Sequence, residues 1–198
     1  MIEAAVRLEC DVRGNPCLAA ILDRFEEIDL PDAWLVAGAI AQTVWNGAAG
    51  RAPEAGIKDV DIVYFDAADL SAEAEAAEEA RLRAAFAALP VTLDVKNEAR
   101  VHLWYERKFG KPIAPYRSTR DAIATFPTTA TSVGVRIHRG RFETCAPFGL
   151  DDLFGLVVRA NRRQIDEPVY AAKVARWRTV WPGLTILPWE EVRGTGEG

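Results

Sequence analysis

One segment, residues 58–65, limits more than any other how this chain can fold. It reads Lys-Asp-Val-Asp-Ile-Val-Tyr-Phe, so its second half is a continuous run of β-branched and aromatic residues. Such a run is typical of a strand that is buried on both faces of a sheet. Asp59 and Asp61 stand two positions apart, which directs both carboxylates to one face, with backbones about 6.5 to 7 Å apart. We therefore expect a buried strand that carries a pair of acids near its beginning.

The segments around this strand alternate between helical and extended patterns. The expected helices cover residues 16–30, capped by Asn15, then 39–45, 71–89, 118–126, 151–159 and 167–177, and the expected strands cover 34–37, 58–65, 91–96, 102–105, 133–138 and 141–145. Arg139-Gly140 joins the last two strands as a β-hairpin. This order predicts an α+β fold class, a mixed β-sheet flanked by helices with C-terminal helices packed on it.

The length of 198 residues suits a single domain, residues 1–198. We expect about 1–30 to form an N-terminal helical segment, about 31–146 the sheet-containing core, about 147–189 the C-terminal helical part, and 190–198 a tail. No apolar run approaches the roughly 20 residues of a membrane span, and the first residues do not resemble a secretory signal. We therefore expect a cytoplasmic protein, and the three cysteines, which contain no CxxC pair, do not indicate zinc.

The charges are distributed unevenly along the chain. The formal net charge is −5, yet residues 1–99 carry 8 basic and 19 acidic side chains, whereas residues 100–150 carry 9 basic and 3 acidic ones. The basic stretch is either a solvated positive face or a phosphate-facing wall opposite a metal-binding acidic one. The acidic total makes a long nucleic acid an unlikely partner, because such binding relies on several cationic contacts to phosphates.

A third acid extends the pair on the buried strand. Asp94 lies on the polar side of the expected strand 91–96, so it joins Asp59 and Asp61 in one cleft if the two strands are neighbours. Clustered carboxylates repel one another, and Mg²⁺ or Mn²⁺ relieves that repulsion. Three such acids are the equipment for metal-dependent phosphoryl or nucleotidyl transfer. The alternative is that all three are ordinary solvent-facing residues.

A glycine turn precedes the acids. The expected strand 34–37 ends at Gly38, and a helix follows directly. Without a Cβ, backbone N–H groups at such a turn approach phosphate oxygens, and the helix N-terminus favours the anion.

Three separated segments together resemble a known family. They are Ala-Gly-Ala-Ile-Ala-Gln-Thr-Val-Trp-Asn at 37–46, Lys-Asp-Val-Asp-Ile-Val-Tyr-Phe-Asp at 58–66 and Ala-Pro-Phe-Gly-Leu-Asp-Asp-Leu-Phe at 146–154. They are similar to a bacterial nucleotidyltransferase-like family, with no established substrate, of the DNA-polymerase-β-type nucleotidyltransferase superfamily. The resemblance covers about residues 30–189 and implies the nucleotidyltransferase-like fold.

The resemblance also implies roles for single residues. Gly38 and Ala39 would form the phosphate-cradling turn, and Asp59, Asp61 and Asp94 would be the catalytic acids and metal ligands. Ala39 stands where the superfamily usually has Ser or Gly, so a hydroxyl contact to phosphate is missing. The gap of 21 positions from Gly38 to Asp59 is longer than usual, with residues 47–56 expected to form a loop.

Further side chains are candidates for contacts with a nucleotide. Arg120 and Lys173 are taken as nucleotide-binding, with Arg117 and Arg176 as weaker candidates, and the alternative is that each is solvated or ion-paired on the surface. The hydroxyl-rich stretch 128–132 either binds a nucleotide or the acceptor, or is an ordinary loop. The tryptophans near the C-terminus either stack on a base or belong to the core, and they are Trp177, Trp181 and Trp189.

The sequence thus favours a metal-dependent nucleotidyltransferase that uses Mg²⁺ or Mn²⁺. It would transfer a nucleoside monophosphate from an NTP to an unidentified acceptor hydroxyl. A protein that binds a nucleotide or another ligand without turnover is the alternative. A third possibility is a regulatory or interaction protein with a solvated acidic face and no metal affinity.

Overall fold

A five-stranded mixed sheet is the centre of the fold, in the computed structural model that describes residues 2–191. Its strand order is β3-β2-β1-β4-β5, and a two-stranded pair, β6-β7, lies apart from it. The strands are β1 (Trp34–Val36), β2 (Asp59–Tyr64), β3 (Thr92–Asn97), β4 (Gly134–His138), β5 (Arg141–Cys145), β6 (Val157–Val158) and β7 (Thr185–Ile186). The α-helices are α1 (Ile2–Arg13), α2 (Pro16–Asp23), α3 (Gly38–Ala48), α4 (Ala72–Ala85), α5 (His102–Phe109), α6 (Thr119–Ile123), α7 (Asp151–Phe154) and α8 (Glu167–Val180).

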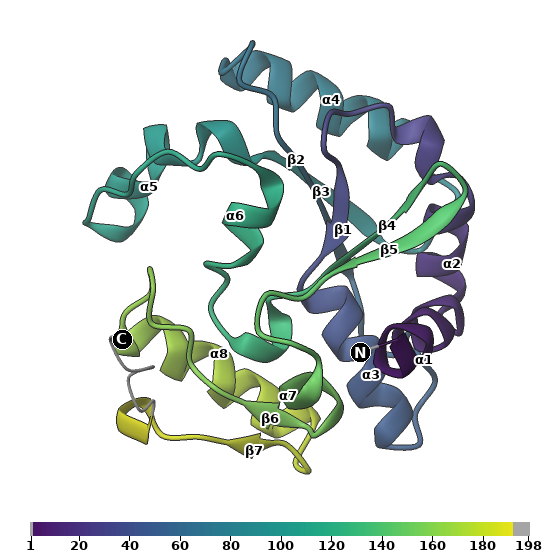
Figure 1. Cartoon of the computed structure of the whole chain (residues 1–198), viewed down its shortest axis with the longest axis vertical. Coiled ribbons are helices and arrows are strands. Elements are labelled where there is room, and N and C mark those ends of the chain that lie inside the picture. The colour runs from purple at the N-terminus through teal and green to yellow at the C-terminus, as the bar shows by residue number, and fades with distance from the viewer. Residues whose placement is uncertain (1, 192–198) are drawn as a thin grey trace.

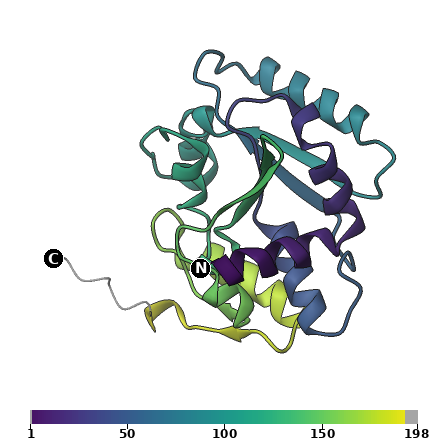
Figure 2. The ribbon, with the colours of Figure 1, turned by 45° about the vertical axis from the view of Figure 1, so that its right-hand side comes forward.

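The predicted α+β class and mixed sheet are confirmed. Helices α1 and α2 lie on one side in Figure 1, α4 crosses the top, α5 and α6 lie on the other side, and α8 lies at the bottom with the β6-β7 pair. The turned view in Figure 2 shows the strands running between these helices. Among residues 2–191, no helix combines the length and the apolar character that crossing a bilayer requires.

Strand β2 lies between β3 and β1 in the sheet. It runs antiparallel to β1, with Asp61 opposite Val36, and parallel to β3, with Asp61 opposite Asp94. Parallel neighbours need a long crossover, and α4 supplies it, with Ser71 capping its first turn by accepting from the N–H of Ala74. The predicted segments for β2, α4 and β3 are therefore confirmed.

The N-terminal helices pack beside α3. Asn15 caps α2 by accepting hydrogen bonds from the N–H groups of Cys17 and Leu18, as predicted. Its amide also donates to Thr43 Oγ1 over 2.8 Å, which ties this cap to α3. The expected helix 16–30 is shorter than predicted, because α2 ends at Asp23 and a 3₁₀ turn covers Phe25–Ile28.

Helix α8 packs on α3 through tryptophans. Trp45 of α3 meets Trp177 and Trp181 edge to face, with ring centroids 5.3 and 5.5 Å apart. Trp181 Nε1 also donates to Asn46 Oδ1 over 2.9 Å. Trp177 and Trp181 are 4% and 5% exposed, so both belong to the core. Aromatic edge contacts and a buried hydrogen bond together fix the C-terminal helix against α3.

Two predicted elements are wrong. Residues 102–105 form the first turn of α5 rather than a strand, because Val101 and Tyr105, four positions apart, are the buried residues, which is a helical spacing. The helix expected at 151–159 ends at Phe154, since Leu156 adopts a positive φ of 57° and the β-branched pair Val157–Val158 forms β6. Of the expected tail, residues 192–198 lie outside the described residues.

Candidate functional site

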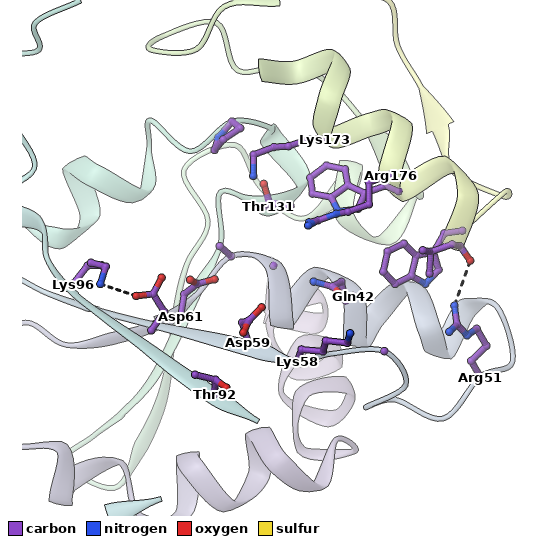
Figure 3. A pocket seen from close by; sticks show the side chains of 18 of the residues that line it. Gln42, Arg51, Lys58, Asp59, Asp61, Thr92, Lys96, Thr131, Lys173 and Arg176 are labelled. Atoms are coloured by element: carbon purple, nitrogen blue, oxygen red, sulfur yellow. Dashed lines mark hydrogen bonds and ion pairs between the residues drawn. The ribbon is translucent and has the colours of Figure 1, made fainter. Parts of the chain in front are cut away.

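A cavity of about 900 Å³ lies between the edge of the sheet and helices α3 and α8. Figure 3 shows Asp59 and Asp61 on the sheet side and Lys173 and Arg176 on the helix above them. The lining residues are Ala37, Gly38, Gln42, Arg51, Gly56, Lys58, Asp59, Asp61, Glu79, Arg83, Thr92, Asp94, Lys96, Pro127, Thr131, Lys173, Arg176, Trp177, Val180 and Trp181.

The three acids singled out from the sequence meet in this cavity. Asp59 and Asp61 leave the same face of β2, and Asp94 lies on β3 in register with Asp61. Side chains at paired positions of parallel strands point to the same face, which brings the carboxylates together. The structure thus confirms the expected neighbourhood, while the roles of these acids as catalytic residues and metal ligands stay predictions.

Burial and crowding act on Asp61. Desolvation, followed by the nearby charge of Asp94, raises the pKa of Asp61 from 3.8 to about 6, with a smaller contribution from Asp59. Lys173 and Lys96 oppose this rise. A carboxylate in such surroundings gains free energy when a cation approaches it.

Asp94 already has a cationic partner. Lys96 Nζ lies 2.7 Å from Asp94 Oδ1 and 2.9 Å from Glu79 Oε2, an acid on α4. The two carboxylates raise the pKa of Lys96 against the effect of burial. Lys96 therefore stays charged and bridges β3 to α4 at the edge of the cavity.

The donor set can be compared with what a divalent ion requires. Mg²⁺ takes hard oxygen ligands, and one or two carboxylates with substrate phosphates commonly suffice. Asp59 and Asp61 supply such oxygens, and burial, followed by the charge of Asp94, raises the pKa of Asp61. Within residues 2–191, however, no group of three or more His, Cys, Asp and Glu side chains is arranged to hold a metal ion. Asp59 and Asp61 are therefore suited to a cation, whereas the expected three-carboxylate site with Asp94 is not preformed among residues 2–191.

The turn before α3 borders the cavity, because Ala37 and Gly38 are among the lining residues. Helix α3 begins at Gly38, and its N-cap residue Ala37 forms no capping hydrogen bond through its side chain. Ala37 adopts φ 59° and ψ −120°, a conformation that favours glycine. The first N–H groups of a helix lack intrahelical partners and attract anions. This turn is therefore suited to phosphate oxygens.

The residues of this turn differ in detail from the expected pair. Gly38 lines the cavity, as does Ala37, which the sequence did not single out. Ala39 is 1% exposed, and its carbonyl accepts from Thr43 Oγ1, so its side chain belongs to the core. Gln42, one helical turn after Gly38, lines the cavity with its amide.

Helix α8 supplies cationic groups on the opposite wall. Lys173 and Arg176 both line the cavity. Desolvation, then the charge of Arg176, lowers the pKa of Lys173, while Asp61 opposes the shift. An anion that binds beside a half-buried lysine stabilises its charged form, which burial and a neighbouring cation destabilise. The predicted Lys173 therefore lies where a phosphate contact is possible.

The structure does not bring Arg120 to the cavity. It lies on α6 with its guanidinium 4.5 Å from the centroid of the Trp34 ring and 4.0 Å from Glu143. The other basic residues of 100–150 do not line the cavity either. The cationic side chains that line it are Arg51, Lys58, Arg83, Lys96, Lys173 and Arg176. The basic stretch is thus not the wall of this cavity, because α5, α6 and the β4-β5 hairpin carry it elsewhere.

One buried donor in the cavity wall has no partner. Trp177 is 4% exposed and lines the cavity, and its Nε1 forms no hydrogen bond among the described residues. A buried N–H without an acceptor is costly, and such groups call for an explanation. Of the stretch 128–132, Thr131 also lines the cavity, but its hydroxyl bonds to Thr128.

Some of these residues could have been found from the sequence. Gln42 follows Gly38 by four positions, which is one helical turn, and Lys96 follows Asp94 by two positions, which is the same face of a strand. The backbone of Ala37 gives no signal in the sequence, because an alanine with positive φ is uncommon.

Comparisons with known proteins agree with this geometry. A family model described as nucleotidyltransferase matches residues 23–186. A protein solved by NMR, described as revealing a CCA-adding enzyme head domain, is 28% identical, and the match covers 91% of this chain and 93% of that one with a TM-score of 0.75. Comparison with curated proteins finds no match.

Proposed function

The chain belongs to the nucleotidyltransferase family, and from this premise we propose that it transfers a nucleoside monophosphate from an NTP to an acceptor hydroxyl with Mg²⁺ or Mn²⁺. The observation that carries the proposal is the meeting of paired carboxylates, a helix N-terminus and a lysine in one cavity. Asp59 and Asp61 come from β2, Gly38 begins α3, and Lys173 comes from α8. These groups match the needs of a triphosphate with its counterion.

Asp59 and Asp61 are the proposed metal ligands. When bound, the ion supplies positive charge that offsets the charge developing on the phosphoryl oxygens. The two carboxylates need no rearrangement of the backbone to share an ion, because they leave one face of a single strand. Burial and the charge of Asp94 destabilise the ionised form of Asp61, and a bound cation would offset this destabilisation.

The triphosphate is proposed to lie between α3 and α8. Backbone N–H groups at Gly38 donate to phosphate oxygens, and Lys173 neutralises part of their charge from the opposite wall. As the acceptor oxygen forms its bond to the α-phosphorus, the bond to pyrophosphate breaks, and Asp94 is the proposed recipient of the hydroxyl proton. Arg120 is not proposed to contact the nucleotide, because it lies away from this cavity.

Pyrophosphate release tests the proposal. The wild-type chain is incubated with each of the four NTPs, Mg²⁺ and a panel of hydroxyl acceptors, and pyrophosphate is measured. Asp59→Asn and Asp61→Asn are expected to abolish release. Asp66→Asn is the matched control, because Asp66 follows β2 closely but does not line the cavity. Equal release by the wild type and both cavity variants would overturn the proposal.

A second function is favoured by one observation. Because Asp94 is paired with Lys96 and no group of three ligands is preformed among residues 2–191, the chain also suits nucleotide binding without turnover. Calorimetry distinguishes the two functions. Mg²⁺-dependent binding of an NTP without pyrophosphate release from any acceptor would favour the binding protein.

A further inference from the structure

Lys96 has no role in the proposed reaction, yet it is the cation nearest to the third acid. Its Nζ lies 2.7 Å from Asp94 Oδ1, and Glu79 of α4 holds the same ammonium group at 2.9 Å. Two carboxylates thus fix one lysine between β3 and α4. Because both partners raise the pKa of Lys96, the ammonium stays charged.

This arrangement changes what Asp94 offers to a metal ion. Lys96 Nζ engages Oδ1, one of the two carboxylate oxygens of Asp94, so fewer of its lone pairs are left for a divalent cation. Coordination by Asp94 would also bring a divalent charge close to a fixed ammonium group, and like charges at such short range repel strongly. Asp59 forms no ion pair among the described residues, and neither does Asp61, so no ammonium group occupies their carboxylate oxygens, although the charges of Lys173 and Lys96 reach Asp61 from a greater distance.

We propose that Lys96 acts as a built-in cation that withholds Asp94 from metal coordination, so that the divalent ion of this site is held by Asp59 and Asp61 alone. This inference rests on the proposed function, because it presupposes a divalent ion on β2. It assigns Lys96 as a positioning residue, which acts through Asp94.

A thermodynamic cycle on Mn²⁺ binding tests the inference without measuring activity. Mn²⁺ alone is titrated into the full chain, and the free ion is followed by electron paramagnetic resonance. In the wild type, Asp94→Asn is expected to change the Mn²⁺ affinity by no more than about twofold. In a Lys96→Met background, the released Asp94 becomes a ligand, so Asp94→Asn is expected to weaken binding by at least about tenfold. Lys96→Gln serves as a second background that also removes the charge.

Two controls separate ligation from general electrostatics. Lys58→Met removes one positive charge from the same cavity without touching Asp94, so Asp94→Asn is expected to have a small effect in that background. Lys96→Arg keeps the charge, and its Mn²⁺ affinity is expected to stay near that of the wild type. If Asp94→Asn weakens Mn²⁺ binding in the Lys58→Met background as much as in the Lys96→Met background, the role of Lys96 is not specific.

The decisive opposing result is an equal loss in both backgrounds. If Asp94→Asn weakens Mn²⁺ binding as strongly in the wild type as in Lys96→Met, Asp94 ligates the ion in spite of Lys96 and the inference is overturned. Absence of Mn²⁺ binding in every variant would instead overturn the metal dependence of the proposed function, and the inference with it.

Discussion

Asp61 and Asp94 occupy paired positions on the adjacent parallel strands β2 and β3. Burial and the neighbouring carboxylate raise the pKa of Asp61 to about 6, while Lys96 holds Asp94 at 2.7 Å. Asp61 and Asp94 therefore differ in how their charges are balanced. One lacks an ion-pair partner within residues 2–191, and the other is neutralised by the protein itself.

The pH dependence of stability should report the raised pKa of Asp61. Its folded pKa of about 6 exceeds the ordinary value of 3.8, so the folded state holds more protons than the unfolded state between these values. Stability is therefore lost as pH rises through about 4 to 6, by up to about 3 kcal/mol. Asp61→Asn, which cannot ionise, is expected to be more stable than the wild type at pH 8 and similar to it at pH 4. Urea unfolding at the two pH values measures this, and a difference independent of pH would contradict it.

The strained turn before α3 should respond to glycine. Ala37 has φ 59°, so Ala37→Gly relieves strain of about 1 to 3 kcal/mol and loses about 0.5 to 1 kcal/mol to chain entropy. A net gain of about 1 kcal/mol corresponds to a rise in Tm of about 2 to 4 °C. Ala39→Gly is the matched control, because Ala39 lies inside α3 and is buried, so a lower Tm is expected. A lower Tm for both variants would show that Ala37 is not strained.

Trp177 should donate a hydrogen bond to a bound nucleotide. Trp177→Phe keeps an aromatic ring but removes the buried N–H, and a hydrogen bond to a charged acceptor is worth about 1.5 to 3 kcal/mol. NTP affinity is therefore expected to fall at least about tenfold by calorimetry. Trp45→Phe is the control, because it removes another buried N–H without a partner from a residue that does not line the cavity. The NTP affinity of this variant should equal that of the wild type. Tripolyphosphate serves as a second ligand, and unchanged affinity for it would mean that the N–H contacts the nucleoside rather than a phosphate.

The junction between α3 and α8 should depend on Asn46. This residue is 0% exposed, accepts from Trp181 Nε1 and donates to the carbonyls of Pro53 and Ala55. Asn46→Ala leaves these groups unpaired inside the protein, which should cost about 3 kcal/mol or more in urea unfolding. Trp181→Phe should cost less in the Asn46→Ala background than in the wild type, because the shared hydrogen bond is already absent. Additive losses would show that the bond contributes little.

Much of the fold follows from periodicity in the sequence. The buried run of β2, the alternation of β3 and the cap of α4 each have a local signal, and all three were predicted. The short strands β6 and β7 have two residues each, so they depend on pairing between distant segments rather than on local pattern. For α5, the apolar and aromatic residues at 102–105 suggested a strand, but packing of Val101 and Tyr105 decided for a helix.

The site was predictable in its acids and less so in its other parts. Asp59, Asp61 and Asp94 could be grouped because strand geometry fixes the direction of each side chain. Arg120 and Lys173 looked alike in the sequence, and only the packing of α6 and α8 separates them. The pairing of Lys96 with Glu79 required the position of α4, which no local pattern gives.

The hydrogen bond between Trp181 and Asn46 joins positions that are 135 residues apart in the chain. A ribosome therefore makes the strand acids and the glycine turn long before it makes α8, which completes the opposite wall. Until α8 is made, the chain lacks Lys173 and Arg176, the cations of the wall that faces Asp59 and Asp61. The proposed binding of a nucleotide therefore requires segments that lie far apart in the chain, β2 and α3 on one wall of the cavity and α8 on the other.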